Sequence, residues 1–218
     1  MKTTLSFDGQ AAALLLIDFQ EEQRHDPLYK VPGLSQILKN AARLLDTART
    51  LRHMVVHAAY IRDFTKVPPR PYEPTAADGK PTFSDAASSL TTICHEVAPR
   101  DGEPVITKND ASAFCEGDLA ARLRARGITW LVVSGVWTEA CVAATVRDAM
   151  AHGLRVLLVK DACGSATSAM QKTAVLNLAN RLYGGAVADT ERAVSLLNGE
   201  TAEVFVAERP VPILFNFT

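Results

Sequence analysis

Cysteine and histidine are scarce in this chain, and their spacing excludes several kinds of site. Only four of the 218 residues are cysteine and five are histidine. The cysteines form no Cys-x-x-Cys pair, and the histidines are scattered without the spacing of a zinc site. We therefore expect free thiols in a reducing compartment.

Three further features that the sequence lacks restrict the kinds of partner expected for this protein. No apolar run is long enough to span a bilayer, and residues 1–8 lack the apolar core of a signal peptide. The formal net charge is only −1, so nothing favours nucleic acid or an anionic membrane. We expect a cytoplasmic protein that binds small molecules. With 48% hydrophobic residues, the chain 1–218 can bury the core of one domain.

What the sequence does contain is a cysteine placed shortly after an apolar strand. Residues 130–135 form an apolar run that ends at Gly135, and a helix is predicted over 138–152, so Cys141 falls in its first turn. Backbone N–H groups and the positive end of the helix dipole favour a thiolate there. Cys141 is therefore a candidate nucleophile, whereas most free cysteines are small buried hydrophobes chosen for packing.

Two other apolar runs also end at charged residues. Asp18 follows residues 11–17, and Lys108 closes the run that begins at residue 104. Alone, Asp18 would be read as a turn cap and Lys108 as a solvated cation. Because open α/β sheets bind ligands at the carboxyl ends of their strands, we expect both residues to approach Cys141. Lys108 is then expected to lower the pKa of the thiol and to keep Asp18 ionised.

Cys163 is the rival nucleophile. It also follows an apolar strand, predicted over 155–160, and a glycine-containing turn is expected around it. No helix begins directly after it, so its thiolate would lack that stabilisation. Cys94 and Cys115 are expected to be structural or incidental.

The segments around these residues resemble the isochorismatase-like cysteine hydrolases. The resemblance covers about residues 10 to 200 and rests on three segments, the last followed by Thr145 and Asp148: Ile17-Asp18-Phe19-Gln20, residues 108–114, and Gly135-Val136-Trp137-Thr138-Glu139-Ala140-Cys141-Val142. The Gly-x-x-Thr-x-x-Cys-Val pattern is specific when the aspartate and lysine segments precede it in this order.

The apolar patterns alternate between strands and helices. They predict strands over 12–18, 54–60, 104–108, 130–135, 155–160 and 185–188, and helices over 34–53, 117–126, 138–152, 168–182 and near 190–198. Repeated βα units imply a parallel sheet with right-handed crossovers. The resemblance implies a three-layer α/β/α fold with a six-stranded sheet of order 3-2-1-4-5-6.

The resemblance also implies a mechanism. Cys141 would attack an amide carbonyl, Asp18 would take the thiol proton and later activate water, and Lys108 would couple the two. The acyl group would pass through a thioester, which divides one difficult step into two. The oxyanion would be held by the backbone N–H groups of Trp137 and Cys141, next to a cis peptide bond between Val136 and Trp137.

The interval 61–102 interrupts the strand and helix pattern and contains many prolines. A connection of this length is usually functional, so we expect it to wall the active site, lined by Tyr60, Arg62, Phe64 and Tyr72. For Arg62, a solvated surface cation is an equally good interpretation as a substrate contact. The metal-dependent nicotinamidases carry an Asp-x-His pair here, whereas Asp63 stands in Arg62-Asp63-Phe64. We predict no catalytic metal and no cofactor.

The expected substrate is a small amide with a carbamoyl, ureido or related group. Aromatic residues that would contact a flat acyl group are Phe19, Tyr60, Phe114 and Trp137. Polar contacts to the amide or ureido group are expected from Gln20, Arg62, Asn109 and Glu139.

Two alternatives remain open. One is an isochorismatase-type hydrolase of a vinyl ether, with Asp18 as proton donor. The other is a catalytically silent member that serves as an interaction protein, because a fold does not determine its function. The apolar C-terminal segment 208–218 is expected to dock on its own domain or across a homo-oligomer interface. The resemblance implies a dimer or a tetramer.

Overall fold

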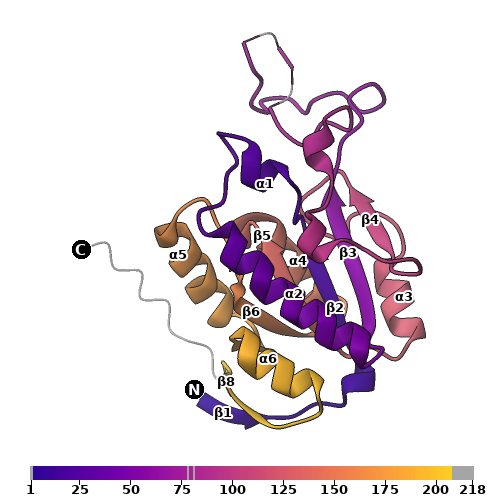
Figure 1. Ribbon diagram of the computed structural model, residues 1–218, viewed down its shortest axis with the longest axis vertical. Coiled ribbons are helices and arrows are strands. Elements are labelled where there is room, and N and C mark those ends of the chain that lie inside the picture. Colours follow the sequence, from indigo (N-terminus) through magenta and orange to yellow (C-terminus); the bar gives the residue numbers. More distant parts are fainter. Residues whose placement is uncertain (1, 78, 81, 208–218) are drawn as a thin grey trace.

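The computed structural model describes residues 2–77, 79–80 and 82–207, and the predicted C-terminal docking segment lies outside them. The described residues form one mixed sheet with helices on both of its faces (Figure 1). None of their helices is long and apolar enough to cross a membrane.

Eight strands of the described residues make up the sheet, in the order β1-β8-β7-β6-β5-β2-β3-β4. The six predicted strands are all present and parallel, as β2 (Ala12–Ile17), β3 (Met54–Tyr60), β4 (Val105–Lys108), β5 (Trp130–Val136), β6 (Arg155–Gly164) and β7 (Ala186–Ala188). Taken alone they run β4-β3-β2-β5-β6-β7, which confirms the order 3-2-1-4-5-6.

The predicted strand count is too low by two. β8 (Ala202–Phe205) pairs with both β7 and β1 (Lys2–Leu5), and both pairings are antiparallel. Both strands are short and partly exposed, so they lack the continuous apolar run that marks a strand covered on both faces. They extend the sheet at the edge remote from β4.

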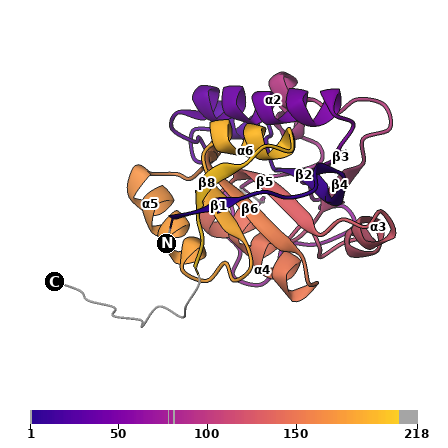
Figure 2. The same ribbon diagram turned by 90° about the horizontal axis from the view of Figure 1, so that it is seen from below.

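Helices cover the two faces separately, as the view along the sheet shows (Figure 2). Helices α2 (Leu34–Thr50) and α6 (Thr190–Leu197) pack on one face, where their buried apolar residues join one core cluster. Helices α3 (Leu119–Ala125), α4 (Ala143–Ala151) and α5 (Ser168–Ala179) supply the other cluster. The predicted three-layer arrangement is therefore confirmed.

The two central strands, β2 and β5, are buried along their whole length. β2 and β5 are paired, with Ile17 opposite Gly135. Gly135 permits their close approach, because a Cβ atom there would lie 2.4 Å from the carbonyl oxygen of Ile17. A side chain would thus push the strands apart where both of them end. The glycine of the sequence motif is explained by this close approach.

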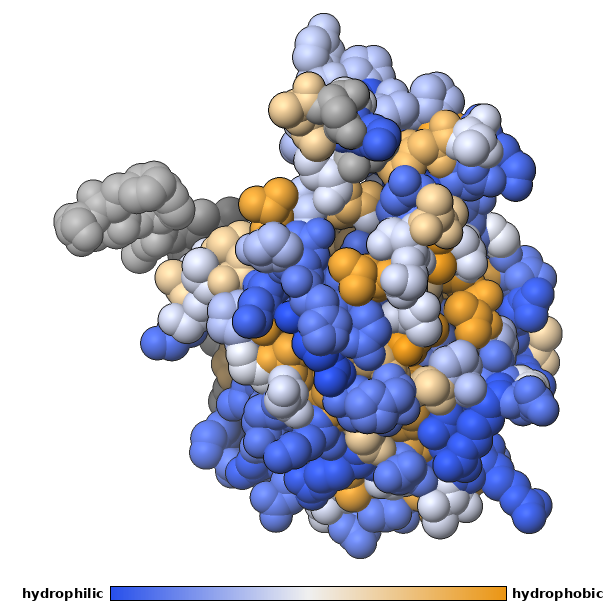
Figure 3. Space-filling view, turned by 45° about the horizontal axis from the view of Figure 1, so that its top comes forward, coloured by the Kyte–Doolittle hydropathy of each residue, from blue (hydrophilic) through white to orange (hydrophobic). Residues whose placement is uncertain are grey.

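The proline-rich interval between β3 and β4 extends beyond the end of the sheet, next to the short helix α1 (Glu22–His25) (Figure 1). Its described part contains two short 3-10 turns, Ser89–Thr91 and His95–Val97. The space-filling view turned toward this end shows mostly hydrophilic residues with apolar ones in scattered groups (Figure 3).

Candidate active site

Three strand ends place the predicted catalytic residues. Asp18 directly follows β2, Lys108 is the last residue of β4, and Cys141 lies in a π-helical turn, Thr138–Val142, between β5 and α4. Because these strands are parallel, their carboxyl ends meet at one edge of the sheet.

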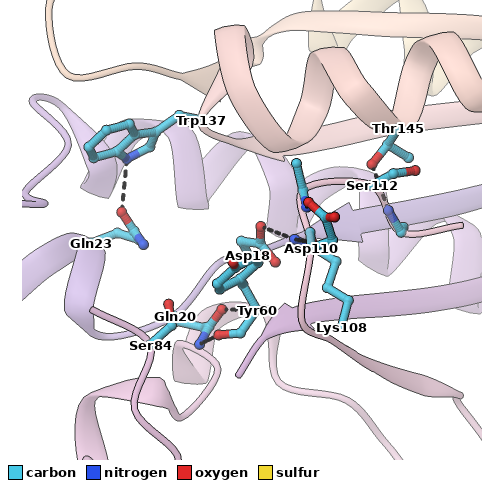
Figure 4. A network of polar contacts seen from close by, with 12 residues as sticks. Asp18, Gln20, Gln23, Tyr60, Ser84, Lys108, Asp110, Ser112, Trp137 and Thr145 are labelled. Atoms are coloured by element: carbon cyan, nitrogen blue, oxygen red, sulfur yellow. Dashed lines mark hydrogen bonds and ion pairs between the residues drawn. The ribbon is translucent and has the colours of Figure 1, made fainter. Parts of the chain in front are cut away.

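Asp18 and Lys108 form a buried ion pair (Figure 4). Lys108 Nζ lies 2.9 Å from Asp18 Oδ2, and the side chains are 0% and 5% exposed for Lys108 and Asp18 respectively. Lys108 Nζ also donates a hydrogen bond to the carbonyl oxygen of Asp110 and lies 4.5 Å from the ring centre of Tyr60. Neither carboxylate oxygen of Asp18 accepts a well-aligned hydrogen bond from the described residues, so both can still accept one from a substrate or water.

Burial and the ion pair act on the pKa values of these two residues in opposite directions. Burial raises the pKa of Asp18, and the Lys108 ammonium offsets only part of that rise. For Lys108, burial lowers the pKa, but its interactions with Asp18 and Cys141 outweigh this effect, so the net pKa is raised. The lysine therefore stays charged, while the aspartate is able to hold a proton more readily than an exposed one.

The thiol of Cys141 interacts with both Asp18 and Lys108 and is partly buried. Burial raises its pKa, and the Asp18 charge adds to this rise, while Lys108 opposes it. Lys108 lowers the pKa of the thiol, as expected, but burial has the larger effect, so the net pKa is raised. A base must remove this proton during the reaction.

The peptide bond between Val136 and Trp137 is cis, as the resemblance implied. The backbone carbonyl oxygen of Trp137 accepts hydrogen bonds from the N–H groups of Ala140 and Val142. The indole Nε1 of Trp137 donates a hydrogen bond to Gln23 Oε1 at 2.9 Å (Figure 4). The oxyanion-binding role of the Trp137 and Cys141 N–H groups remains a prediction.

A hydrogen bond ties the segment after Lys108 to the helix that follows the nucleophile. The backbone N–H of Ala113 donates to Thr145 Oγ1 at 3.0 Å, and Thr145 is completely buried on α4 (Figure 4). Thr145 of the sequence motif therefore fixes the segment after Lys108 in position relative to helix α4.

A cavity of about 390 Å³ opens beside Asp18 and Cys141. Its aromatic walls come from four residues in ring contact with one another, namely Tyr29, Tyr60, Phe83 and Trp137. Further polar and charged residues line it: Glu22, Gln23, Arg70, Glu73, Ser84 and Asp110.

Tyr60 and Trp137 are the two predicted aromatic contacts that line this cavity; Phe19 and Phe114 do not. Phe19 is 2% exposed and belongs to the core under α2. Phe114 packs against the His152 ring with 5.0 Å between ring centres. Phe19 thus belongs to one core cluster, and Phe114 packs against the other.

The predicted polar contacts are engaged elsewhere. Gln20 is fully buried and its side chain bonds the backbone of Tyr60 and Thr91. Glu139 contacts the Ser165 hydroxyl, and the backbone carbonyl oxygen of Asn109 accepts a hydrogen bond from Arg70 at 3.0 Å. Gln20, Asn109 and Glu139 are absent from the cavity lining, and their binding roles remain predictions.

The proline-rich interval does wall the cavity, although through other residues than predicted. Arg62 is 2% exposed, pairs with Glu73 and lies 4.7 Å from the ring centre of Phe64. Tyr72 is fully exposed. Arg62, Phe64 and Tyr72 are absent from the cavity lining, so the prediction that they line it is wrong.

Several residues that line the cavity were not predicted from the sequence. Glu22 and Gln23 begin the short helix α1, which follows Asp18 closely in the sequence, and this nearness to the end of β2 was the available signal that they lie at the same edge of the sheet. Tyr29 and Phe83 meet from two irregular segments, with 5.1 Å between ring centres, and no periodic pattern connects such segments. They supply the aromatic surface that Phe19 and Phe114 were expected to provide.

The rival thiols lie outside the cavity. Cys163 is buried in β6, which continues to Gly164 where a turn was expected, and burial raises its pKa to about 12. Cys94 is buried, which raises its pKa to about 11. These positions favour Cys141 as the nucleophile.

One group in the described residues has side chains of the metal-binding types, Glu21, Cys94 and Glu96. Arg24 lies among them, 3.2 Å from Glu21 Oε2 and 2.8 Å from Glu96 Oε2, and so already compensates their charge. Asp63, at the position where the nicotinamidases carry their Asp-x-His pair, pairs with Lys66 at 2.8 Å. Neither place converges on the cavity.

A parallel sheet that brings a carboxylate, an ammonium group and a thiol to one cavity defines an α/β protein with a cysteine-centred site. A family model described as the isochorismatase domain matches residues 12–192. The chain belongs to the isochorismatase family.

Relatives and solved structures agree. The chain is 34% identical to maleamate amidohydrolase of Pseudomonas putida over 189 residues, which cover 82% of this chain and 84% of that one. It is 28% identical to N-carbamoylsarcosine amidase of an Arthrobacter species, over 78% of this chain and 64% of that protein. The fold is similar to that of a cysteine hydrolase from Pseudomonas syringae pv. phaseolicola, with a TM-score of 0.78 at 19% identity, covering 89% of this chain and 95% of that one.

Proposed function

We propose that this protein is a cysteine-dependent hydrolase that cleaves the C–N bond of a small amide through an acyl-thioester intermediate. The observation that supports it most directly is the convergence of Asp18, Lys108 and Cys141 beside one cavity. Relatives named as amidohydrolase and amidase support an amide as the substrate.

In the first step the sulfur of Cys141 attacks the amide carbonyl carbon while Asp18 takes the thiol proton. The resting thiol is protonated because its pKa is raised, so proton removal and attack must be coupled. The oxyanion would accept hydrogen bonds from the N–H groups of Trp137 and Cys141. When the C–N bond breaks, Asp18 returns the proton to the leaving nitrogen.

In the second step a water molecule attacks the thioester. Asp18 takes a proton from this water and passes it to the sulfur as the C–S bond breaks, which restores the thiol and the Asp18 carboxylate as the carboxylic acid leaves. Burial raises the pKa of Asp18, which brings it closer to the range where a residue both takes and gives a proton efficiently. The Lys108 ammonium lowers the pKa of Asp18 and so favours its charged form between these transfers.

The cavity supports a small, flat substrate. Its volume of about 390 Å³ suits a molecule of metabolite size, and its aromatic walls favour planar groups. Carbamoyl and ureido compounds have this shape. The mechanism requires neither a cofactor nor a metal ion.

The test is ammonia release from a panel of carbamoyl, ureido and aromatic amides, measured in chelator with wild type and Cys141→Ala. Cys115→Ala is the matched control, because Cys115 is exposed and lies outside the cavity lining. Release by the wild type and the control, but not by Cys141→Ala, is expected. Equal release by all three would reject the thiol mechanism, and activity on a vinyl ether that survives Cys141→Ala would favour the ether hydrolase.

We also propose a homo-oligomer, which the resemblance implied. Exposed apolar side chains on and after α5, Met170, Leu176 and Tyr183, support it. Light scattering on the full chain and on a chain ending at Ala207 would show whether the protein associates and whether the last residues contribute. A monomer in both cases would contradict the proposal.

A further inference from the structure

Some charged side chains that line the cavity form an ion pair with a side chain of opposite charge, whereas others do not. Asp18 is paired with Lys108 at 2.9 Å, as described above. Glu73 is paired with the buried Arg62 and also accepts a hydrogen bond from the backbone N–H of Arg70. Both carboxylates therefore have a cation in contact before any substrate arrives.

Arg70 is the cation among the lining residues that a substrate carboxylate would meet first. Its Nη2 lies 3.1 Å from Asp110 Oδ2 and donates to the carbonyl oxygen of Asn109 at 3.0 Å. The Arg70 and Asp110 side chains are 47% and 52% exposed, so water screens the pair. A substrate anion at Arg70 would have to compete with a carboxylate that is already in place.

Glu22 is the lining carboxylate without such a partner. It is 4% exposed at the start of α1, and no lysine, arginine or histidine of the described residues forms an ion pair with it. Its Oε1 accepts hydrogen bonds from Ser84 Oγ at 2.8 Å and Gln23 Nε2 at 3.3 Å, and its Oε2 accepts from the Ser84 backbone N–H at 3.0 Å. Oε2 thus keeps one lone pair for a further donor.

A buried carboxylate without a cation is unfavourable unless donors or a positive charge approach it. Burial raises the pKa of Glu22, and the nearby Asp18 charge adds to the rise even though Ser84 opposes it. A substrate that presents N–H donors or a positive charge would relieve this cost. A substrate carboxylate at the same place would increase it.

We infer that Glu22 selects substrates whose part remote from the scissile C–N bond carries N–H donors or a positive charge, and disfavours those that end in a carboxylate there. This rests on the proposed function and refines its substrate class. Ureido, amidine and amine groups fit this requirement, whereas the acid end of a dicarboxylic acid monoamide does not.

The charge preference of the cavity is measurable without turnover. Methanethiosulfonate reagents convert the Cys141 thiol to a mixed disulfide and release methanesulfinate, and they exist with an ammonium or a sulfonate tail. The experiment uses the full chain with Cys115→Ala at pH 8, with peptide mass spectrometry to follow Cys141. Rates are divided by those of 2-mercaptoethanol with the same reagent, so intrinsic reactivity cancels.

We expect the ammonium reagent to modify Cys141 about tenfold faster than the sulfonate reagent after this correction, as one nearby unscreened charge would produce. Glu22→Gln, with an isosteric side chain, should lower the ratio severalfold. Glu200→Gln, which removes an exposed carboxylate remote from the cavity lining, should leave it unchanged.

A sulfonate reagent that reacts as fast as the ammonium reagent would overturn the inference. An unchanged ratio in a folded Glu22→Gln protein, with folding checked by circular dichroism, would also overturn it. If that variant does not fold, the wild-type ratio alone decides. Silence of the amide panel with an intact labelling ratio would reject the proposed function and leave the charge preference of the cavity standing.

Discussion

Lys108 Nζ lies 2.9 Å from Asp18 Oδ2, although the two residues end strands that are not neighbours. β3 lies between β2 and β4, and the lysine side chain crosses its end beside the Tyr60 ring. Both members of the pair are nearly inaccessible to water. In such a pair the mutual attraction offsets the desolvation of each charge, and removing one partner leaves the other buried and unpaired.

Single substitutions in this pair should therefore reduce stability strongly. We expect Asp18→Asn and Lys108→Met each to lower the free energy of unfolding by about 3–5 kcal/mol, and the double variant to recover most of that loss. All three should lose amide hydrolysis by about 10³-fold or more, since the base or its cation is missing. Urea unfolding and ammonia release measure the two effects.

The exposed pair of Asp63 and Lys66 provides the control. Its atoms are 2.8 Å apart, but the Lys66 and Asp63 side chains are 79% and 36% exposed to solvent. Lys66→Met should leave the free energy of unfolding and the activity unchanged within error. Additive losses in the Asp18→Asn/Lys108→Met double variant would show that the buried pair is not coupled.

The reactivity of Cys141 should depend on pH as that of a buried thiol does. Its pKa is raised by burial and by Asp18, so the rate of alkylation by iodoacetamide should climb steadily from pH 7 to pH 9 without a plateau. In Asp18→Asn the rise should move to lower pH, because Lys108 then acts on the thiol without the opposing carboxylate. Mass spectrometry in a Cys115→Ala background follows the modification. A wild-type plateau below pH 8 would show a resting thiolate and contradict this account.

The sequence was sufficient to predict the residues that end the parallel strands. Asp18 and Lys108 each close a continuous apolar run, and the chemistry of such positions follows from the parallel topology. The same patterns predicted all six parallel strands, and the family resemblance implied their order. They did not predict β1 and β8, whose short, half-exposed segments show no run of buried residues.

The cavity walls could not be predicted in the same way. Phe83 and Ser84 lie in a segment without periodicity, and their partners Tyr29 and Glu22 come from the single-turn helix α1 and the irregular segment after it. Periodic patterns report which face of an element is buried and carry no information about how two loops meet. The predominance of burial over Lys108 in setting the pKa of Cys141 could not be predicted either, because a local pattern does not show how much of the thiol is desolvated.

Gln171 on α5 should act as a positioning residue for the nucleophile turn. Its Oε1 accepts from Thr138 Oγ1 at 2.6 Å, and its Nε2 donates to the carbonyl oxygens of Lys160 and Cys163 at 3.0 and 3.2 Å. Gln171→Leu should lower the free energy of unfolding by about 1–3 kcal/mol, because buried groups lose their partners.

The kinetic effect should separate positioning from a purely structural loss. We expect Gln171→Leu to lower kcat by about tenfold or more with little change in KM, because small misplacements of a reacting group slow the chemical step. Lys172→Leu on the exposed side of the same helix is the control and should change neither quantity. A raised KM at unchanged kcat would assign Gln171 to substrate binding instead.

Glu103 should determine a large part of the loss of stability in acid. Its carboxylate accepts hydrogen bonds from Arg49 Nε and Nη2, both at 2.8 Å, and lies 3.1 Å from His57 Nε2, so it joins α2 to β3. These contacts, with Arg49 the largest contributor, lower the pKa of Glu103 from 4.5 to about 2. A carboxyl with a lowered folded-state pKa contributes stability that is present above about pH 4.5 and is lost as the pH falls toward 2.

The contribution of Glu103 is about 3 kcal/mol, and its loss should appear in urea unfolding curves between about pH 4.5 and pH 2. Glu103→Gln should lower the free energy of unfolding at pH 7 and flatten its decline over this pH range, since the variant has no carboxyl to protonate. Glu200→Gln, an exposed site, should keep the wild-type slope. His57 has a pKa lowered chiefly by burial, so its protonation also weakens the fold in acid and leaves a residual slope in Glu103→Gln. An identical slope in wild type and Glu103→Gln would show that acid acts on other carboxylates and that the Arg49 contacts do not control this transition.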